Sequence, residues 1–238
     1  MTEGILGALT PSEIEAVRLS LKVAAVSVLA SLPLGFALAW LLARFRFPGK
    51  TLVDAFIHLP LVLPPVVVGY FLLVLLGRRG PIGQWLDQAF GIVFAFRWTG
   101  AALACGLMGL PLMVRAIRQS LEGIDRRLES AAATLGAGRW AVLASVTIPL
   151  CLPGILTGML LSFARSLGEF GATITFVSNI PGETQTLPLA IYTYTQVPGG
   201  DPQAMRLCLL SVILSLGALV LSEALVRRAN RRILGDAH

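Results

Sequence analysis

The stretch of sequence that decides the fold is AVRLSLKVAAVSVLASLPLGFALAWLLA, residues 16–43. It exceeds the roughly 20 apolar residues that an α-helix needs to cross the hydrocarbon core of a membrane. It is also too long for the apolar part of a secretory signal peptide, and no convincing cleavage site follows it. We therefore interpret residues 16–43 as a membrane-spanning helix that is retained in the mature protein.

The whole chain has the composition of a membrane protein. Of its 238 residues, 55% are hydrophobic and 13% are charged, and the mean hydropathy is +0.78, whereas soluble domains have about 25% charged residues. The prediction is an all-α polytopic protein with a single transmembrane domain over residues 1–238. Cys105, Cys151 and Cys208 are isolated in apolar segments, so we expect packing residues rather than disulfides or a metal site.

Five segments qualify as membrane spans. They are residues 16–43, 52–76, 98–117, 152–177 and 204–226. A polar connection follows the fourth, and its portion near Leu187 is predicted to be a short or re-entrant helix, with a sixth span there as the structural alternative. Pro60, Pro64 and Pro65 in the second span and Pro111 in the third predict kinks around a pathway, although prolines are also common in membrane helices of no special function.

Orientation follows from the positions of Lys and Arg, because short connections rich in these residues stay in the cytoplasm. Three connections have this composition. Their cations are Arg44, Arg46 and Lys50; Arg115, Arg118, Arg126, Arg127 and Arg139; and Arg227, Arg228, Arg231 and Arg232. Arg78, Arg79 and Arg97 oppose the assignment but are fewer. We predict an N-terminus outside and a C-terminus in the cytoplasm. The net charge of +6 is explained by topology, and no nucleic-acid partner is expected.

The connection between the third and fourth spans contains ESAAATLGAGRW, residues 129–140, followed by VTIP, residues 146–149. Alanine and leucine favour a helix, and Gly136 and Gly138 favour its end. Small side chains let such a helix enter a cleft of another protein, with Glu129 and neighbouring arginines fixing the register through charged contacts. The pattern is typical of a coupling surface and not of a catalytic site.

This stretch resembles the EAA loop of ABC-transporter permeases, in which an acidic residue, two alanines and a later glycine precede an I-x-L-P-like ending. The resemblance implies the fold of a type I importer permease, with a coupling loop over about residues 119–149. It also implies ATPase-coupling roles for a set of residues, and Ser130 departs from the second acidic residue of the oxyanion branch. The set is Glu129, Ser130, Ala131, Ala132, Gly136, Gly138, Arg139, Trp140 and Pro149.

A second resemblance covers the other half of the chain. SFARSLGEFGAT (162–173), NIPG (179–182), TQTLPL (184–189), LPLVLPPVVVGY (59–70) and GRRGPIG (77–83) look like the molybdate permease family of the molybdate, tungstate and sulfate group. This implies a homodimer in the inner membrane with two ATP-binding subunits and an external oxyanion-binding protein. It would move molybdate by alternating access, with sulfate and tungstate as alternative cargoes.

Arg165 and Glu169 are spaced i, i+4 inside an apolar run, close enough to form an ion pair on one helix face. Ionisable groups at membrane depth usually face a bundle interior or water. We predict that Arg165, Glu169 and the adjacent Phe170 line or gate a translocation path. An equally weighted alternative is a pair that only locks helices together.

The chain has no recognisable nucleotide site. Gly49-Lys50-Thr51 matches the end of a P-loop, but Arg44 stands where the first glycine should be. No enzymatic activity is expected in this chain, and ATP and magnesium are expected on the partner ATPase. His58 is interpreted as a satisfied core residue. The rival classes are a stand-alone channel or secondary carrier, which would need no docking helix, and a membrane enzyme, for which no catalytic constellation is present.

Overall fold

The computed structural model describes residues 9–234, except for the side chains of residues 222, 225 and 229–234. The outermost residues of the predicted domain, 1–8 and 235–238, therefore lie outside the described part. Every regular element in residues 9–234 is helical. The elements are α1 (Pro11–Arg44), α2 (Lys50–Val62), α3 (Pro65–Leu76), α4 (Pro81–Phe90), α5 (Trp98–Glu122), α6 (Arg126–Thr134), α7 (Arg139–Val142), a π-helical turn η1 (Leu143–Thr147), α8 (Ile148–Leu167), α9 (Gly171–Val177), α10 (Leu187–Thr195) and α11 (Asp201–Leu234).

The first helix begins at a capping box. Thr10 Oγ1 accepts a hydrogen bond from Glu13 N at 3.4 Å, and the Glu13 carboxylate accepts one from Thr10 N at 2.7 Å, so two donors that a helix start leaves unpaired are satisfied. Between Lys22 and Arg44 the helix has no charged residue. These residues rise about 30 Å, the thickness of the hydrocarbon core. Lys22 and Arg44 therefore mark the levels of the two membrane surfaces.

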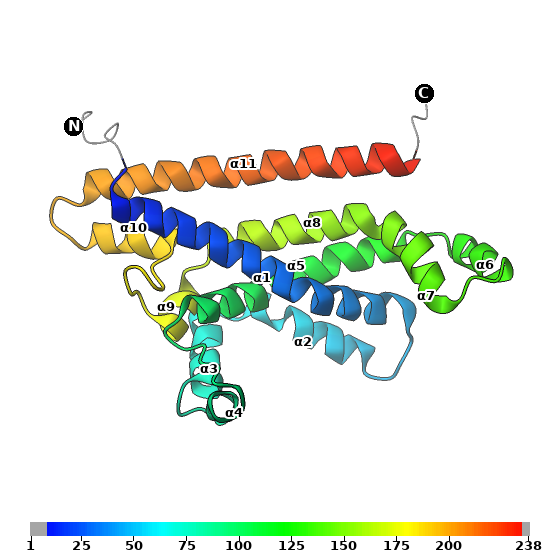
Figure 1. The fold of residues 1–238 in the computed structure, drawn as a ribbon, viewed down its shortest axis with the longest axis horizontal. Helices are drawn as coiled ribbons and strands as arrows, with labels where there is room; N and C mark the ends of the chain where they lie inside the picture. Colours follow the sequence, from blue (N-terminus) through cyan, green and yellow to red (C-terminus); the bar gives the residue numbers. More distant parts are fainter. Residues whose placement is uncertain (1–8, 235–238) are drawn as a thin grey trace.

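The second predicted span is sharply bent. The helix direction bends by 109° between α2 and α3. The bend lies at the junction of Leu63 and Pro64, where consecutive prolines remove two backbone donors. Leu63 is accordingly extended, with φ −70° and ψ 144°. As a result α3 runs across the bundle while α2 runs along it (Figure 1). Pro60 and Pro111 are accommodated inside α2 and α5.

The fourth predicted span, residues 152–177, is divided in the structure. Helix α8 ends at Leu167, and α9 begins only at Gly171. Helix α10 has nine residues, about 14 Å of helix, so it is too short to be the alternative sixth span. Within residues 9–234, four helices are long and apolar enough to cross a membrane, and the bent pair α2–α3 raises the number to five.

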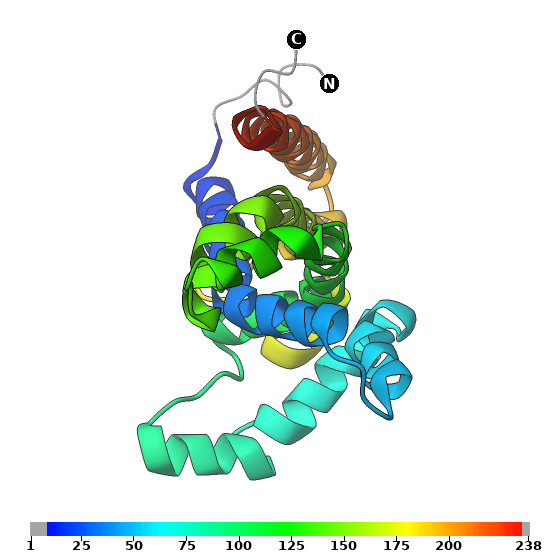
Figure 2. The ribbon, with the colours of Figure 1, turned by 90° about the vertical axis from the view of Figure 1, so that its right-hand side faces the viewer.

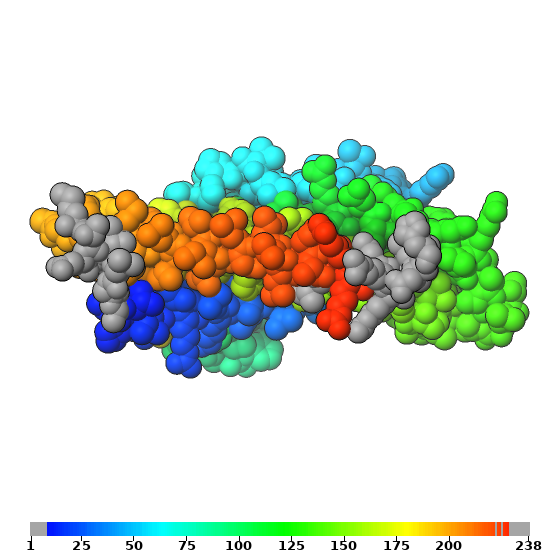
Figure 3. All heavy atoms as spheres, turned by 90° about the horizontal axis from the view of Figure 1, so that it is seen from above, coloured from blue at the N-terminus to red at the C-terminus, as the bar shows by residue number. Residues whose placement is uncertain are grey.

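Helix α5 is the centre of the bundle, between α1 and α8. Small residues let the helices approach closely: a side chain on Gly109 would place its Cβ 2.2 Å from Ser162 Oγ of α8. Helix α11 lies along one side of the molecule (Figure 3) and packs against α8 and α10. Many of its large apolar side chains, such as Ile213 and Val220, are exposed, as expected for a helix that faces lipid.

The two ends of the bundle differ in composition (Figure 1). One end holds the last turns of α1, α5 and α11 together with α6 and α7, and all three connections rich in Lys and Arg lie there. The opposite end holds α10 and the first turns of α1 and α11. There Arg206 of α11 pairs with the buried Glu13 of α1, with 2.6 Å between Nη2 and Oε1.

Candidate coupling surface and polar helix break

Helix α6 is held apart from the bundle and buries none of its residues. Asp125 caps its start by accepting a hydrogen bond from Arg127 N at 2.9 Å. Its end is fixed by Gly136, whose φ of +90° is a conformation that glycine adopts without steric cost. Ala131 and Ala132 lie on this helix, and the Ser130 hydroxyl donates to Arg126 O within the same helix.

Two large apolar side chains project from the segment that follows α6. Leu135 is 89% exposed and Trp140 is 82% exposed. Gly138 caps α7, and Arg139 is its first residue. Exposed apolar groups beside a charged helix mark a surface suited to another protein. The residues predicted to couple this chain to a partner therefore lie together at one end, in a segment that the bundle does not cover.

Glu129 does not face outward with them. Its Oε1 lies 2.5 Å from Arg44 Nη2 and accepts a hydrogen bond from Thr147 Oγ1 at 2.7 Å. Arg44 is the last residue of α1 and Thr147 the last residue of the π-helical turn before α8. The predicted contact of Glu129 with a partner stays a prediction; in the structure its carboxylate joins α6 to Arg44 and Thr147 of its own chain.

The π-helical turn has a local cause. Pro149 lies two residues after it, and a proline ring clashes with the carbonyl four residues earlier, that of Ser145. The wider turn over Leu143–Thr147 relieves that clash, and wide turns of this kind are frequent at functional sites. Helices α7 and α8 thereby form a continuous run from Arg139 to Leu167.

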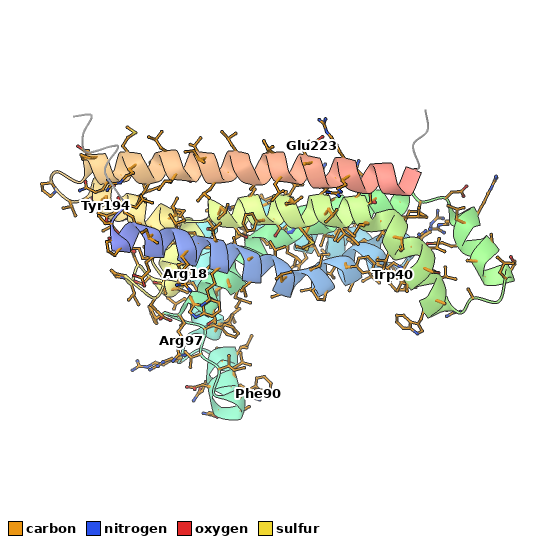
Figure 4. The ribbon with its side chains drawn as sticks, turned by 45° about the horizontal axis from the view of Figure 1, so that its top comes forward. Arg18, Trp40, Phe90, Arg97, Tyr194 and Glu223 are labelled. Carbon is orange, nitrogen blue, oxygen red and sulfur yellow. The ribbon has the colours of Figure 1, made fainter. Side chains whose placement is uncertain are left out.

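A cleft of about 760 Å³ separates the end of α1 from α6 and α7. Phe36, Trp40 and Arg44 line one wall, and Arg139 and Trp140 line the other. Figure 4 shows Trp40 beside this opening. Across this cleft, Glu129 joins α6 to Arg44 and Thr147. The backbone also connects α6 to α5 and α7 to α8.

The second group of predicted residues lies where α8 breaks. Arg165 Nη1 is 2.6 Å from Glu169 Oε2, and the side chains are 27% and 1% exposed. Glu169 Oε1 also accepts a hydrogen bond from Ala172 N at 2.8 Å, in the first turn of α9, where the helix dipole favours a negative charge. The ring of Phe170 contacts that of Tyr192 on α10, with 5.3 Å between centroids.

Helix α9 is in turn packed tightly against α3. A Cβ on Gly69 of α3 would lie 2.5 Å from Ala172 O, and one on Gly171 would lie 2.8 Å from Pro65 Cβ. The buried carboxylate of Glu169 therefore positions α9, and α9 positions the base of α3. The structure brings Arg165, Glu169 and Phe170 together at this break, 16 to 41 residues along the chain from the coupling residues, Glu129 to Pro149.

Sequence reasoning missed two further polar groups. Ser27 of α1 and Ser166 of α8 share a hydrogen bond of 3.1 Å in the core. Arg118 of α5 bridges Asp54 of α2, at 3.1 Å, and Glu122, at 2.8 Å. His58 Nδ1 lies 2.8 Å from Asp54 O, so this histidine has a polar partner within α2. Arg118 and Glu122 are spaced i, i+4 on α5, whereas the Ser27–Ser166 and Arg118–Asp54 contacts join different helices and have no spacing that the sequence could reveal.

These observations define a class: a multi-span helical membrane protein with a short exposed helix at one end. The family model for the binding-protein-dependent transport system inner membrane component matches residues 31–234. This chain belongs to that family. It is therefore a multi-pass inner-membrane permease subunit.

Named relatives extend the comparison. The chain is 62% identical to the molybdenum transport system permease protein ModB of Escherichia coli K12, over 94% of this chain and 98% of that protein. It is 59% identical to ModB of Haemophilus influenzae, over 93% and 96%. It is 37% identical to the sulfate transport system permease protein CysT of Escherichia coli K12, over 94% and 80%.

Solved structures share the fold at low identity. A bacterial ABC transporter involved in the import of alginate has a TM-score of 0.73 and 17% identity, covering 92% of this chain and 80% of that one. The MetNI methionine ABC transporter in an inward-facing conformation has a TM-score of 0.68 and 17% identity, covering 91% and 95%. The predicted type I importer permease fold is confirmed.

Proposed function

We propose that this chain is the membrane-spanning subunit of an ATP-driven importer and forms the translocation path for molybdate. The observation that supports the cargo most strongly is the 62% identity to ModB over nearly the full length of both chains. The relationship to a sulfate permease is more distant, at 37%. Sulfate and tungstate remain the alternative cargoes, because these dianions have similar charge and shape.

The coupling part of the proposal rests on α6 and the exposed Leu135 and Trp140. In the importer an ATPase subunit binds this surface, and ATP and magnesium are held by that subunit. Because Glu129 joins α6 to Arg44 and Thr147, a displacement of α6 pulls on α1 and α8 together. This chain contributes no catalytic group to ATP hydrolysis.

The remaining parts concern assembly and orientation. Two copies enclose one path, with two ATPases on the cytoplasmic side and an oxyanion-binding protein on the outside. The N-terminus is outside and the C-terminus inside, because the three Arg-rich connections share one end of the bundle. Arg165 offers a partly exposed guanidinium beside the break between α8 and α9, where it would meet a passing anion, while Glu169 neutralises part of its charge and so prevents tight binding.

Molybdenum uptake tests the proposal. The chain is expressed with its ATPase and binding protein in a host that lacks its own high-affinity system, and uptake is measured with and without excess sulfate. Uptake that needs all three components and resists sulfate is expected. Uptake abolished by sulfate would move the cargo to sulfate, and uptake that persists with an inactive ATPase would refute the importer assignment and favour a secondary carrier.

A further inference from the structure

Helix α4 has an apolar face that the described chain leaves uncovered. Ile82, Trp85, Leu86, Ala89 and Phe90 follow the i, i+3, i+4 spacing of one helix face. Ile82, Trp85 and Phe90 are 44%, 59% and 64% exposed, and the rings of Trp85 and Phe90 form an edge-to-face pair at 5.6 Å. The opposite face has Gln84, Asp87 and Gln88, so α4 is clearly amphipathic.

The direction of α4 matches that of a helix lying on a membrane surface. The spanning helices run along the long axis of the molecule, whereas α3 crosses it, and α4 is seen nearly end-on in Figure 1. In Figure 2, viewed along the long axis, α4 lies at full length and stands away from the bundle. The α3–α4 arm, residues 65–90, therefore extends in the plane of the membrane.

The arm is level with the outer membrane surface. Lys22, which precedes the uncharged 30 Å of α1, lies 3.5 Å from the ring centroid of Trp98. Trp98 opens α5 directly after the loop that follows α4. From Trp98 to Arg115, its next charged residue, α5 rises about 25 Å, close to the thickness of the hydrocarbon core. Tryptophan at this level is typical of the aromatic belt.

Three cations accompany the apolar face, and we name them the arm arginines: Arg78, Arg79 and Arg97. All three are exposed, and none has a hydrogen bond or ion pair among the described side chains. Arg78, Arg79 and Phe96 line one hollow of about 370 Å³ at the root of α4, and Arg97 follows Phe96. Figure 4 shows Arg97 between Arg18 of α1 and Phe90 of α4. The positive-inside rule leaves these three unexplained.

We propose that the α3–α4 arm is an anchor for anionic phospholipids of the outer leaflet. Ile82, Trp85 and Phe90 enter the acyl boundary, as in other interfacial amphipathic helices, and the arm arginines bind headgroup phosphates. Asp87 then faces water. Depth, direction and charge all agree with this occupant. The inference goes beyond transport of the cargo, and it does not depend on which anion is carried.

Quenching of Trp85 by brominated lipids tests the anchor. The assembled importer is placed in nanodiscs, and the Trp85 signal is the difference between the wild type and Trp85→Phe. Bromines high on the acyl chains should quench this signal. Brominated phosphatidylglycerol should reach half-maximal quenching at a lower mole fraction than brominated phosphatidylcholine. Each arginine that binds a headgroup should lower this mole fraction about fivefold, since each surface cation attracts anionic lipid by about that factor.

The variant with Arg78→Gln, Arg79→Gln and Arg97→Gln should lose the preference for phosphatidylglycerol and keep the quenching by phosphatidylcholine. The control variant Arg46→Gln, Lys50→Gln removes two cations from the opposite end and should keep the preference. A Trp85 signal that neither lipid quenches would overturn the proposal. In that case, disulfide formation between two Trp85→Cys copies would show that a second copy covers α4. Equal quenching by both lipids would overturn the assignment of the arm arginines.

Discussion

The contact between Glu129 and Arg44 provides the sharpest test of how α6 is connected to the bundle. We expect Glu129→Gln to lower molybdenum uptake strongly while the assembled importer continues to hydrolyse ATP. The carboxylate oxygen has two close partners, at 2.5 Å and 2.7 Å. Hydrogen bonds to charged groups contribute about 1.5–3 kcal/mol each, and the Arg44 and Glu129 side chains are only 12% and 21% exposed.

A glutamine keeps one acceptor oxygen but loses the charge, so the loss is about 2 kcal/mol. One such loss changes the ratio of attached to detached α6 by up to about 30-fold, and uptake should fall by a factor of about 10–30. Uptake is measured in cells at matched membrane expression, and ATP hydrolysis is measured in proteoliposomes. Arg44→Gln should give a similar loss, and the double variant should be no worse than either single one.

Glu223→Gln is the matched control. Glu223 pairs with Arg227 near the same end of the molecule, but the two side chains are 62% and 71% exposed, and such pairs contribute only about 0.3–0.5 kcal/mol. The control should transport normally. If Glu129→Gln transports as well as Glu223→Gln, or if the losses at Glu129 and Arg44 add, then α6 is not connected to the bundle through this contact.

Three further substitutions have predictable results. Gly136→Leu places a side chain at φ +90°, which costs about 1–2 kcal/mol, and it should reduce uptake while ATP hydrolysis persists. Its control is Gly138→Ala, which should transport normally because Gly138 has φ −67° and open space around its Cβ. Arg165→Gln leaves the carboxylate of Glu169 buried without its cation and should lower the free energy of unfolding, measured by denaturation in detergent, by about 3–5 kcal/mol. Adding Glu169→Gln should restore part of the lost stability, and no restoration would contradict the charge argument. Gly69→Ala brings a Cβ to 2.5 Å from the backbone of α9 and should lower the melting temperature, the expected penalty for overpacking being about 1–3 kcal/mol; an unchanged melting temperature would show that α3 and α9 are not in such close contact.

The spans could be predicted because each is a long apolar run, but their breaks could not. The prolines at 64 and 65 predict a kink, yet the angle of 109° depends on the packing of α3 against α9. The break after Leu167 lies where Arg165 and Glu169 interrupt the apolar run of residues 152–177, but an ion pair on one continuous helix has the same sequence, so hydropathy could not distinguish the two. The i, i+4 spacing of Arg165 and Glu169 predicts their ion pair, whereas the use of Glu169 to cap α9 requires the break to be known.

The candidate site was predictable only where its residues are neighbours in sequence. The alanines, Gly136 and Trp140 form a recognisable local pattern, and their coupling role stays a prediction. The partners of Glu129 were out of reach, because Arg44 is 85 residues and Thr147 18 residues away along the chain. Helix α4 is different: the spacing of Ile82, Trp85 and Phe90 is present in the sequence, but a helix of ten residues is too short to be recognised as a span.

The two sites are joined by helix α8. Its first end adjoins Thr147, which holds Glu129, and its last turn has Arg165, which holds Glu169 and through it α9 and α3. Because its backbone hydrogen bonds are internal, a helix of 20 residues moves largely as a rigid rod. A displacement of α6 by an ATPase would therefore reach α3 through the Thr147–Glu129 hydrogen bond, helix α8 and the Arg165–Glu169 ion pair. It follows that loss of either contact should disturb transport, but only loss of the Glu129 contacts should do so with the outer half of the bundle intact.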